Sequence, residues 1–145
     1  MATERLCTPG DLVPYLLNPH FNTVSAIIRN PTAGVQSLYN IVGMPVVLGT
    51  NGAGYNLMVA GGEANVLGLI LSGPPGGSAE SVAATTNSKF PYQVLKQGPV
   101  VVNRDKISLV DIAGAALNVT SIVTALLALN KDFDFRTEPV KKTTL

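Results

Sequence analysis

The sequence is poor in the residues from which catalytic and metal sites are built. It holds one histidine, His20, and one cysteine, Cys7, among 145 residues. A single cysteine excludes an intrachain disulfide and fits synthesis in a reducing, intracellular compartment. A metal site needs several His, Cys or carboxylate ligands, and a Ser-His-Asp arrangement would have to use His20 from a proline-rich segment. We therefore expect no catalytic residue, no metal and no cofactor, although an enzyme whose site the sequence does not reveal stays open.

Charge is also scarce. Charged residues make up 13% of the chain, against about 25% in a typical soluble domain. The net charge of +1 gives no electrostatic reason to expect nucleic acid or an anionic membrane as a partner. Low charge with a positive mean hydropathy favours an oligomer or an assembly subunit. The alternative is a monomer whose surface is covered by small residues.

Long apolar runs are missing as well. No segment reaches the roughly 18 apolar residues of a membrane span. The first residues, MATERLCTPGDLVPYLL, lack a basic start followed by an apolar run, so we expect no signal peptide. These features predict a protein made in the cytoplasm with no membrane partner.

The glycine-rich run GTNGAG, residues 49–54, looks at first like a phosphate-binding loop. A Walker loop needs a lysine after its last glycine, and Tyr55 stands there instead. A dinucleotide loop needs a helix after it, and a strand pattern follows here. The pair Asn51-Gly52 instead favours a hairpin turn.

Most of the remaining chain reads as short strands. Apolar or β-branched runs bounded by turn residues predict strands at 23–29, 35–42, 44–49, 55–60, 66–72 and 133–136, and a hairpin over 92–103. Gly68, inside one of these runs, indicates a bulge or a close backbone approach. Residues 73–91 are expected to form a long loop. We expect a mainly β domain, a β-rich α+β fold resembling a compact small barrel.

Helical spacing appears only in the C-terminal half. Residues 118–130 predict a helix with Asn118 or Thr120 as its N-cap and Asn130 as its C-cap. The predicted buried face consists of Ile122, Ala125, Leu126 and Leu129. Residues 108–118 are mixed and predict at most a short helical turn.

Residues 1–22 form a separate segment before a single domain at 23–145. Pro9, Pro14 and Pro19 oppose a helix of any length, so the segment is expected to be an extended arm. Its candidate contact residues are Leu6, Gly10, Leu12, Val13, Tyr15 and Leu16. An extended arm can add as a strand to the sheet edge of a neighbour. Packing of the arm on its own domain is the equal alternative.

Two stretches resemble the head decoration proteins of tailed phages, the family of the lambda head protein D. They are MPVVLGTNGAGYNLMVAGGEANVLGLILS, residues 44–72, and VLKQGPVVVNRDKISL, residues 94–109. The shared pattern runs from a strand opening with proline, through small-residue turns, to an apolar–Gly–apolar–apolar strand, Leu67 to Ile70. A strand ending in a basic residue and a glycine turn follow, at Lys96 and Gly98. The longer N-terminal lead of this chain departs from the shortest family members.

The resemblance implies a structural virion protein without catalytic activity. It implies a homotrimer on the outer surface of the expanded phage head, bound to the major capsid protein at local threefold positions. There it would stabilise the shell against DNA pressure, and the arm residues above are the expected capsid contact. The alternative function is a small β-barrel accessory subunit of another phage or bacterial assembly, such as a tail or baseplate.

Overall fold

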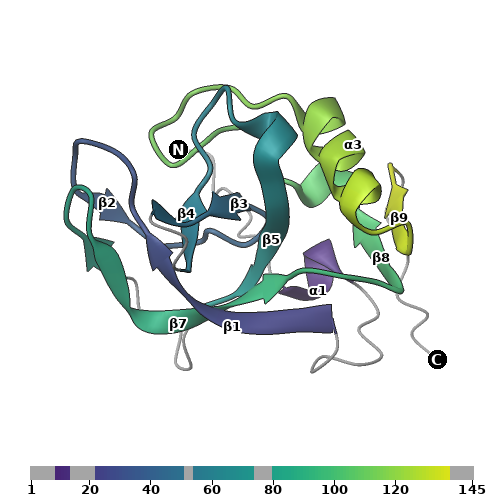
Figure 1. The fold of residues 1–145 in the computed structure, drawn as a ribbon, viewed down its shortest axis with the longest axis horizontal. Coiled ribbons are helices and arrows are strands. Elements are labelled where there is room, and N and C mark those ends of the chain that lie inside the picture. The colour runs from purple at the N-terminus through teal and green to yellow at the C-terminus, as the bar shows by residue number, and fades with distance from the viewer. Residues whose placement is uncertain (1–8, 14–21, 51–53, 74–79, 138–145) are drawn as a thin grey trace, which may run out of the picture.

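The computed structural model describes residues 9–13, 22–50, 54–73 and 80–137. Its central element is a closed barrel with the strand order β1-β4-β3-β5-β7, shown in Figure 1. The barrel strands are β1 (Thr23–Arg29), β3 (Pro45–Leu48), β4 (Tyr55–Leu57), β5 (Val66–Ser72) and β7 (Asn87–Leu95). Only β1 and β4 pair in parallel, while the other barrel neighbours are antiparallel. The expected mainly β, barrel-like fold is confirmed.

Smaller elements surround the barrel. Two short strands, β2 (Gln36–Ser37) and β6 (Ser81–Val82), pair with each other. A parallel pair of β8 (Val100–Asn103) and β9 (Phe133–Arg136) lies on the same side of the barrel as helix α3 (Val119–Leu129) (Figure 1). The described ranges also contain the short helix α1 (Pro9–Leu12) and the 3-10 turns η2 (Glu63–Asn65) and η3 (Arg104–Lys106).

Two apolar cores hold these elements together. The first core takes side chains from all five barrel strands, which places it inside the barrel; its members include Ile28, Val46, Leu57, Ile70, Tyr92 and Val94. The second core joins the outer wall of β5 to α1, α3, β8 and β9, through residues such as Leu12, Leu69, Val102, Ile122, Leu126 and Phe133. Because successive strand residues point to opposite faces, β5 supplies Leu69 to one core and Ile70 to the other.

Gly68 permits a close contact between two barrel strands. A Cβ added there would lie 2.6 Å from the Leu95 carbonyl oxygen and 2.8 Å from Cγ1 of Val94. The pairing of β3 with β5 also shifts register between Val46 and Val47, beside Gly68. The expected bulge or close approach at this glycine is confirmed.

The predicted hairpin over 92–103 is wrong. Both edges of β7 are already used, because β1 and β5 pair with it on either side in the closed barrel. β8 therefore pairs with β9 instead, from Val100 opposite Phe133 to Asn103 opposite Arg136. The predicted loop at 73–91 is also wrong in two places: Ser81–Val82 form β6, and residues 87–91 form the first half of β7 along β1.

Three further local expectations need correction. Within 35–42 only Gln36–Ser37 is a strand, because the buried residues, Leu38 and Ile41, are three positions apart. Residues 108–118 contain a β-bridge between Val110 and Ala116 rather than a helical turn. The predicted extended arm is helical at Pro9–Leu12, where proline can occupy the first turn of a helix.

Helix α3 matches its prediction except at its end. The Asn118 side chain accepts a hydrogen bond from the Ser121 amide at 3.1 Å, and Asn130 is the C-cap. Ile122, Val123 and Leu126 are buried. Leu129 was expected on the buried face but is 58% exposed. This exposed leucine borders the candidate site.

Candidate functional site

The buried polar residues of the described chain serve its own folding. The Glu80 carboxylate accepts hydrogen bonds from the Lys89 amide and from the Tyr92 hydroxyl, the latter at 3.1 Å. Burial raises the pKa of the Tyr92 phenol above its usual range, and the charge on Glu80 and its hydrogen bond add to the effect. Both partners thus fix strand β7 to the residues before β6, and both side chains are buried.

Asp111 has a comparable structural role at one end of the barrel. Its carboxylate accepts three backbone hydrogen bonds of 2.9 Å, from Ala60, Ala113 and Ala115. These bonds hold its own loop in shape and tie it to the loop that follows β4. Three bonds occupy much of the acceptor capacity of a carboxylate, so Asp111 is better suited to holding loops than to catalysis.

The described residues contain no group of three or more His, Cys, Asp or Glu placed to share a metal ion. His20 and Cys7, the two residues the sequence offered for such chemistry, lie outside the described ranges. Among the described helices, none combines the length and apolarity needed to cross a membrane.

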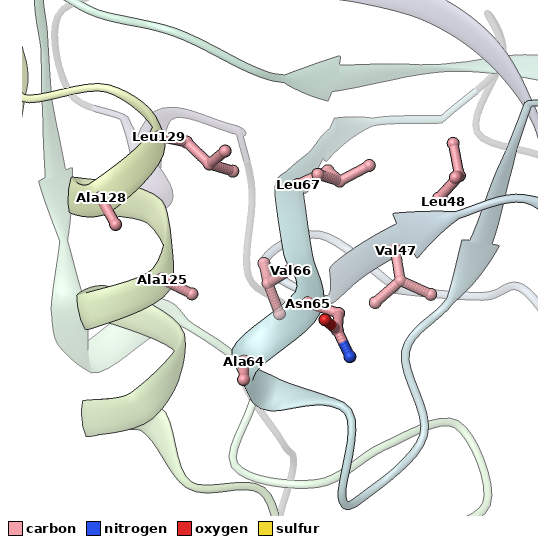
Figure 2. A pocket seen from close by; sticks show the side chains of 9 residues that line it. All are labelled: Val47, Leu48, Ala64, Asn65, Val66, Leu67, Ala125, Ala128 and Leu129. Atoms are coloured by element: carbon pink, nitrogen blue, oxygen red, sulfur yellow. The ribbon is translucent and has the colours of Figure 1, made fainter.

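An apolar groove lies beside α3 in the described part of the chain, and we call it the α3 groove (Figure 2). Helix α3 forms one wall, β3 the other, and η2 with the start of β5 lies between them. The groove has a volume of about 830 Å³ and is lined by Val47, Leu48, Ala64, Asn65, Val66, Leu67, Ala125, Ala128 and Leu129. A second hollow, lined by Thr120, Ser121 and Thr124, shares Ala64, Ala125 and Ala128 and extends the groove along the helix.

Small side chains create this groove. Turn η2 packs against α3, and the facing positions are Ala64 on the turn and Ala125 and Ala128 on the helix. Alanine leaves space there that larger side chains would fill. At its rim, Leu48 is 62% exposed and Leu129 is 58% exposed.

The lining determines what the groove can bind. Small-molecule sites combine an apolar wall with a few polar groups that orient the ligand. Among the groove residues that the structure describes, none is ionisable, and the larger hollow has Asn65 as its one polar side chain. The groove is therefore suited to burying apolar side chains of a protein partner rather than to chemistry on a substrate.

Of the predicted arm contact residues, the structure describes Gly10, Leu12 and Val13, and the two apolar ones are buried. Leu12 is 0% exposed and Val13 is 5% exposed, both within the second core. The Asn103 side chain donates a 2.7 Å hydrogen bond to the Asp11 carbonyl and fixes α1 on β8. Gly10 belongs to α1, while Leu6, Tyr15 and Leu16 lie outside the described residues. At residues 9–13 the structure supports packing of the arm on its own domain.

Sequence reasoning missed the α3 groove. Its residues come from β3, η2, β5 and α3, and only the folded barrel brings them together. A usable signal did exist in the alanines of α3, which are too small to fill the space beside a helix. Comparison with known proteins does not assign a function to the groove, because no protein-family model, curated protein or solved structure matches this chain.

Proposed function

We propose that this chain is a non-catalytic decoration protein that binds the outside of the expanded head of a tailed phage as a homotrimer. Its partner is the major capsid protein at local threefold positions, and its effect is to stabilise the shell against the pressure of packaged DNA. The observation that carries the assembly part of the proposal is the α3 groove, an apolar surface suited to contact with another protein chain, here a second copy, on a chain with little charge.

The resemblance on which the proposal draws falls on one part of the fold. Residues 44–72 supply the consecutive barrel strands β3, β4 and β5, and residues 94–109 supply the end of β7, β8 and η3. The two stretches include much of both cores. The resemblance thus concerns the framework that positions the groove.

Weak contacts are sufficient for this function. A protein that binds only the expanded lattice stabilises it by mass action, by about 2.7 kcal/mol per site at a hundredfold excess over its dissociation constant. Three identical contacts on one trimer raise the overall affinity above that of a single contact by about 10²–10⁴. A shallow surface with no deep binding site can therefore be enough.

The capsid contact is proposed for the N-terminal segment, but with fewer residues than the sequence suggested. Leu12 and Val13 are buried in the domain and cannot contact a capsid while the second core is intact. Leu6, Tyr15 and Leu16 remain the proposed contact residues.

The test is co-sedimentation with heads of the phage that encodes this protein. The wild-type chain should pellet with expanded heads and stay in solution with unexpanded heads. Equal binding to both forms, or binding to neither, would refute the decoration function and favour a tail or baseplate role.

Truncations then locate the capsid contact. Removal of residues 1–8 spares α1 and should leave a folded protein that no longer pellets with expanded heads. Removal of residues 138–145, the opposite end, serves as the matched control and should leave binding unchanged. Full binding after removal of 1–8 would exclude Leu6 as a required contact.

A further inference from the structure

The α3 groove needs an occupant without charge. Burying an unpaired charge against Val66, Leu67 and Leu129 would cost far more than the contact could return. Interface cores are likewise depleted of charged residues. An occupant of this groove would therefore be apolar, and a protein element filling it would have to project far enough to enter an open groove.

One element of this same chain has that character, the loop of residues 109–117, which we call the 109–117 loop. It precedes α3 and arches away from the N-terminal end of the helix in Figure 1. Leu109 is 69% exposed, the largest value among the large apolar side chains that the structure describes, and its neighbour Val110 is 43% exposed. The exposed tip consists of Ala113, Gly114, Ala115 and Ala116.

The 109–117 loop is held in a defined shape. Its two arms are joined by the bridge between Val110 and Ala116 and by a 2.9 Å bond from the Leu117 amide to the Leu109 carbonyl. The Asp111 carboxylate fixes the turn inside and anchors it to Ala60. An element that is already ordered loses less entropy on binding than a flexible one. Asp111 thus acts as a positioning residue for the exposed Leu109.

We propose that the 109–117 loop of one copy inserts into the α3 groove of a second copy. The proposed contact places Leu109 and Val110 of the first copy against Leu48, Leu67 and Leu129 of the second. Both surfaces are apolar and, apart from the inward-facing Asp111, carry no ionisable group among these residues. With a net charge of +1, copies of the chain repel each other little.

Such a contact is heterologous, because a loop on one copy meets a groove on the next. Heterologous contacts generate rings where the rotation closes. That the ring closes with three copies rests on the proposed trimer. The contact between loop and groove does not depend on that number. In this arrangement the α3 groove and the 109–117 loop form the subunit interface, and the N-terminal segment stays available to contact the capsid.

The test compares three variants by sedimentation velocity over a range of concentrations. Leu109→Ser changes the loop and Leu129→Gln changes the groove. Val35→Ser is the matched control, since Val35 is 68% exposed and lies outside both surfaces. We expect the first two to raise the dissociation constant between copies about tenfold or more, and the control to leave it unchanged. Circular dichroism melts establish that each variant is folded.

Mixing gives a positive result that loss of folding cannot mimic. Leu109→Ser and Leu129→Gln chains each keep one intact surface, so an equimolar mixture should form one-to-one dimers that neither forms alone. In a Cys7→Ser background, Leu109→Cys mixed with Leu129→Cys should give a crosslinked dimer with a short bismaleimide. Val35→Cys mixed with Leu129→Cys should give none.

Each outcome decides the inference separately from the proposed function. A wild-type trimer that survives both substitutions, or no crosslink between positions 109 and 129, overturns the loop-in-groove contact but leaves head binding untouched. A monomeric wild-type chain at all concentrations also overturns it. Loss of association with the expected crosslink supports it even where co-sedimentation with heads fails.

Discussion

Substitution of Leu12 by alanine distinguishes a docked N-terminal segment from a free arm. Leu12 is 0% exposed and packs in the second core, and α1 is further held by the hydrogen bond from Asn103 to the Asp11 carbonyl. Leu→Ala at buried sites costs about 2–5 kcal/mol. Because α1 has only four residues, it can detach locally, which limits the cost. We expect a loss of about 2–3 kcal/mol in the free energy of unfolding.

The assay is equilibrium unfolding in urea, with the midpoint and slope fitted together. In a thermal melt of a chain of this size, each kcal/mol lost from the free energy of unfolding lowers Tm by about 2–4 °C, so Tm should fall by about 4–12 °C. Leu127→Ala is the control, since Leu127 is 37% exposed on α3 and should change stability by about 0.5 kcal/mol. If Leu12→Ala costs no more than the control, α1 is not part of the core and the free-arm interpretation returns.

Three other substitutions test the barrel, a buried pair and the helix. Gly68→Ala should lower the free energy of unfolding in urea by about 3 kcal/mol, because its Cβ would lie 2.6 Å from the Leu95 carbonyl oxygen. Gly34→Ala is the control and should lower it little, because there is open space around Gly34. Tyr92→Phe should cost about 1–3 kcal/mol at pH 8 by leaving Glu80 short of a donor. Because folding raises the Tyr92 pKa, the neutral phenol stabilises the folded state fully below about pH 10, and this stabilisation is lost as the pH rises further. The wild-type free energy of unfolding should therefore fall more than that of Tyr92→Phe between about pH 9 and pH 11. Equal losses in the two proteins would contradict this. Asn118→Ala should cost about 1 kcal/mol in thermal unfolding through loss of the N-cap, whereas Asn118→Asp should not.

Elements defined by local patterns could be predicted from the sequence. β1 and β5 have the predicted bounds, 23–29 and 66–72, because β-branched and apolar runs end there at turn residues. Helix α3 was predicted through its N-cap and its three- and four-residue apolar spacing. In each case the information lies within about a dozen consecutive residues.

Elements defined by their partners could not be predicted. The start of β7, residues 87–91, lacks an alternating apolar pattern, and it is a strand because β1 lies beside it, from Arg29 opposite Asn87 to Ile27 opposite Pro91. β8 looked like the second arm of a hairpin, but the closed barrel leaves β7 no free edge. The α3 groove is of the same kind, since no local pattern places Ala64 beside Ala125.

The docked helix α1 separates the two proposed surfaces. Leu12 and Val13 hold the N-terminal segment on the domain, so a capsid contact made by Leu6, Tyr15 and Leu16 need not disturb the α3 groove. Under the proposed function the two surfaces would be coupled through avidity, because three capsid contacts would act together only while the proposed trimer persists. Loss of the loop-in-groove contact would then weaken head binding by up to about 10²–10⁴ without altering any residue at the capsid. If both proposals hold, an apolar groove beside α3 controls capsid affinity without touching the capsid.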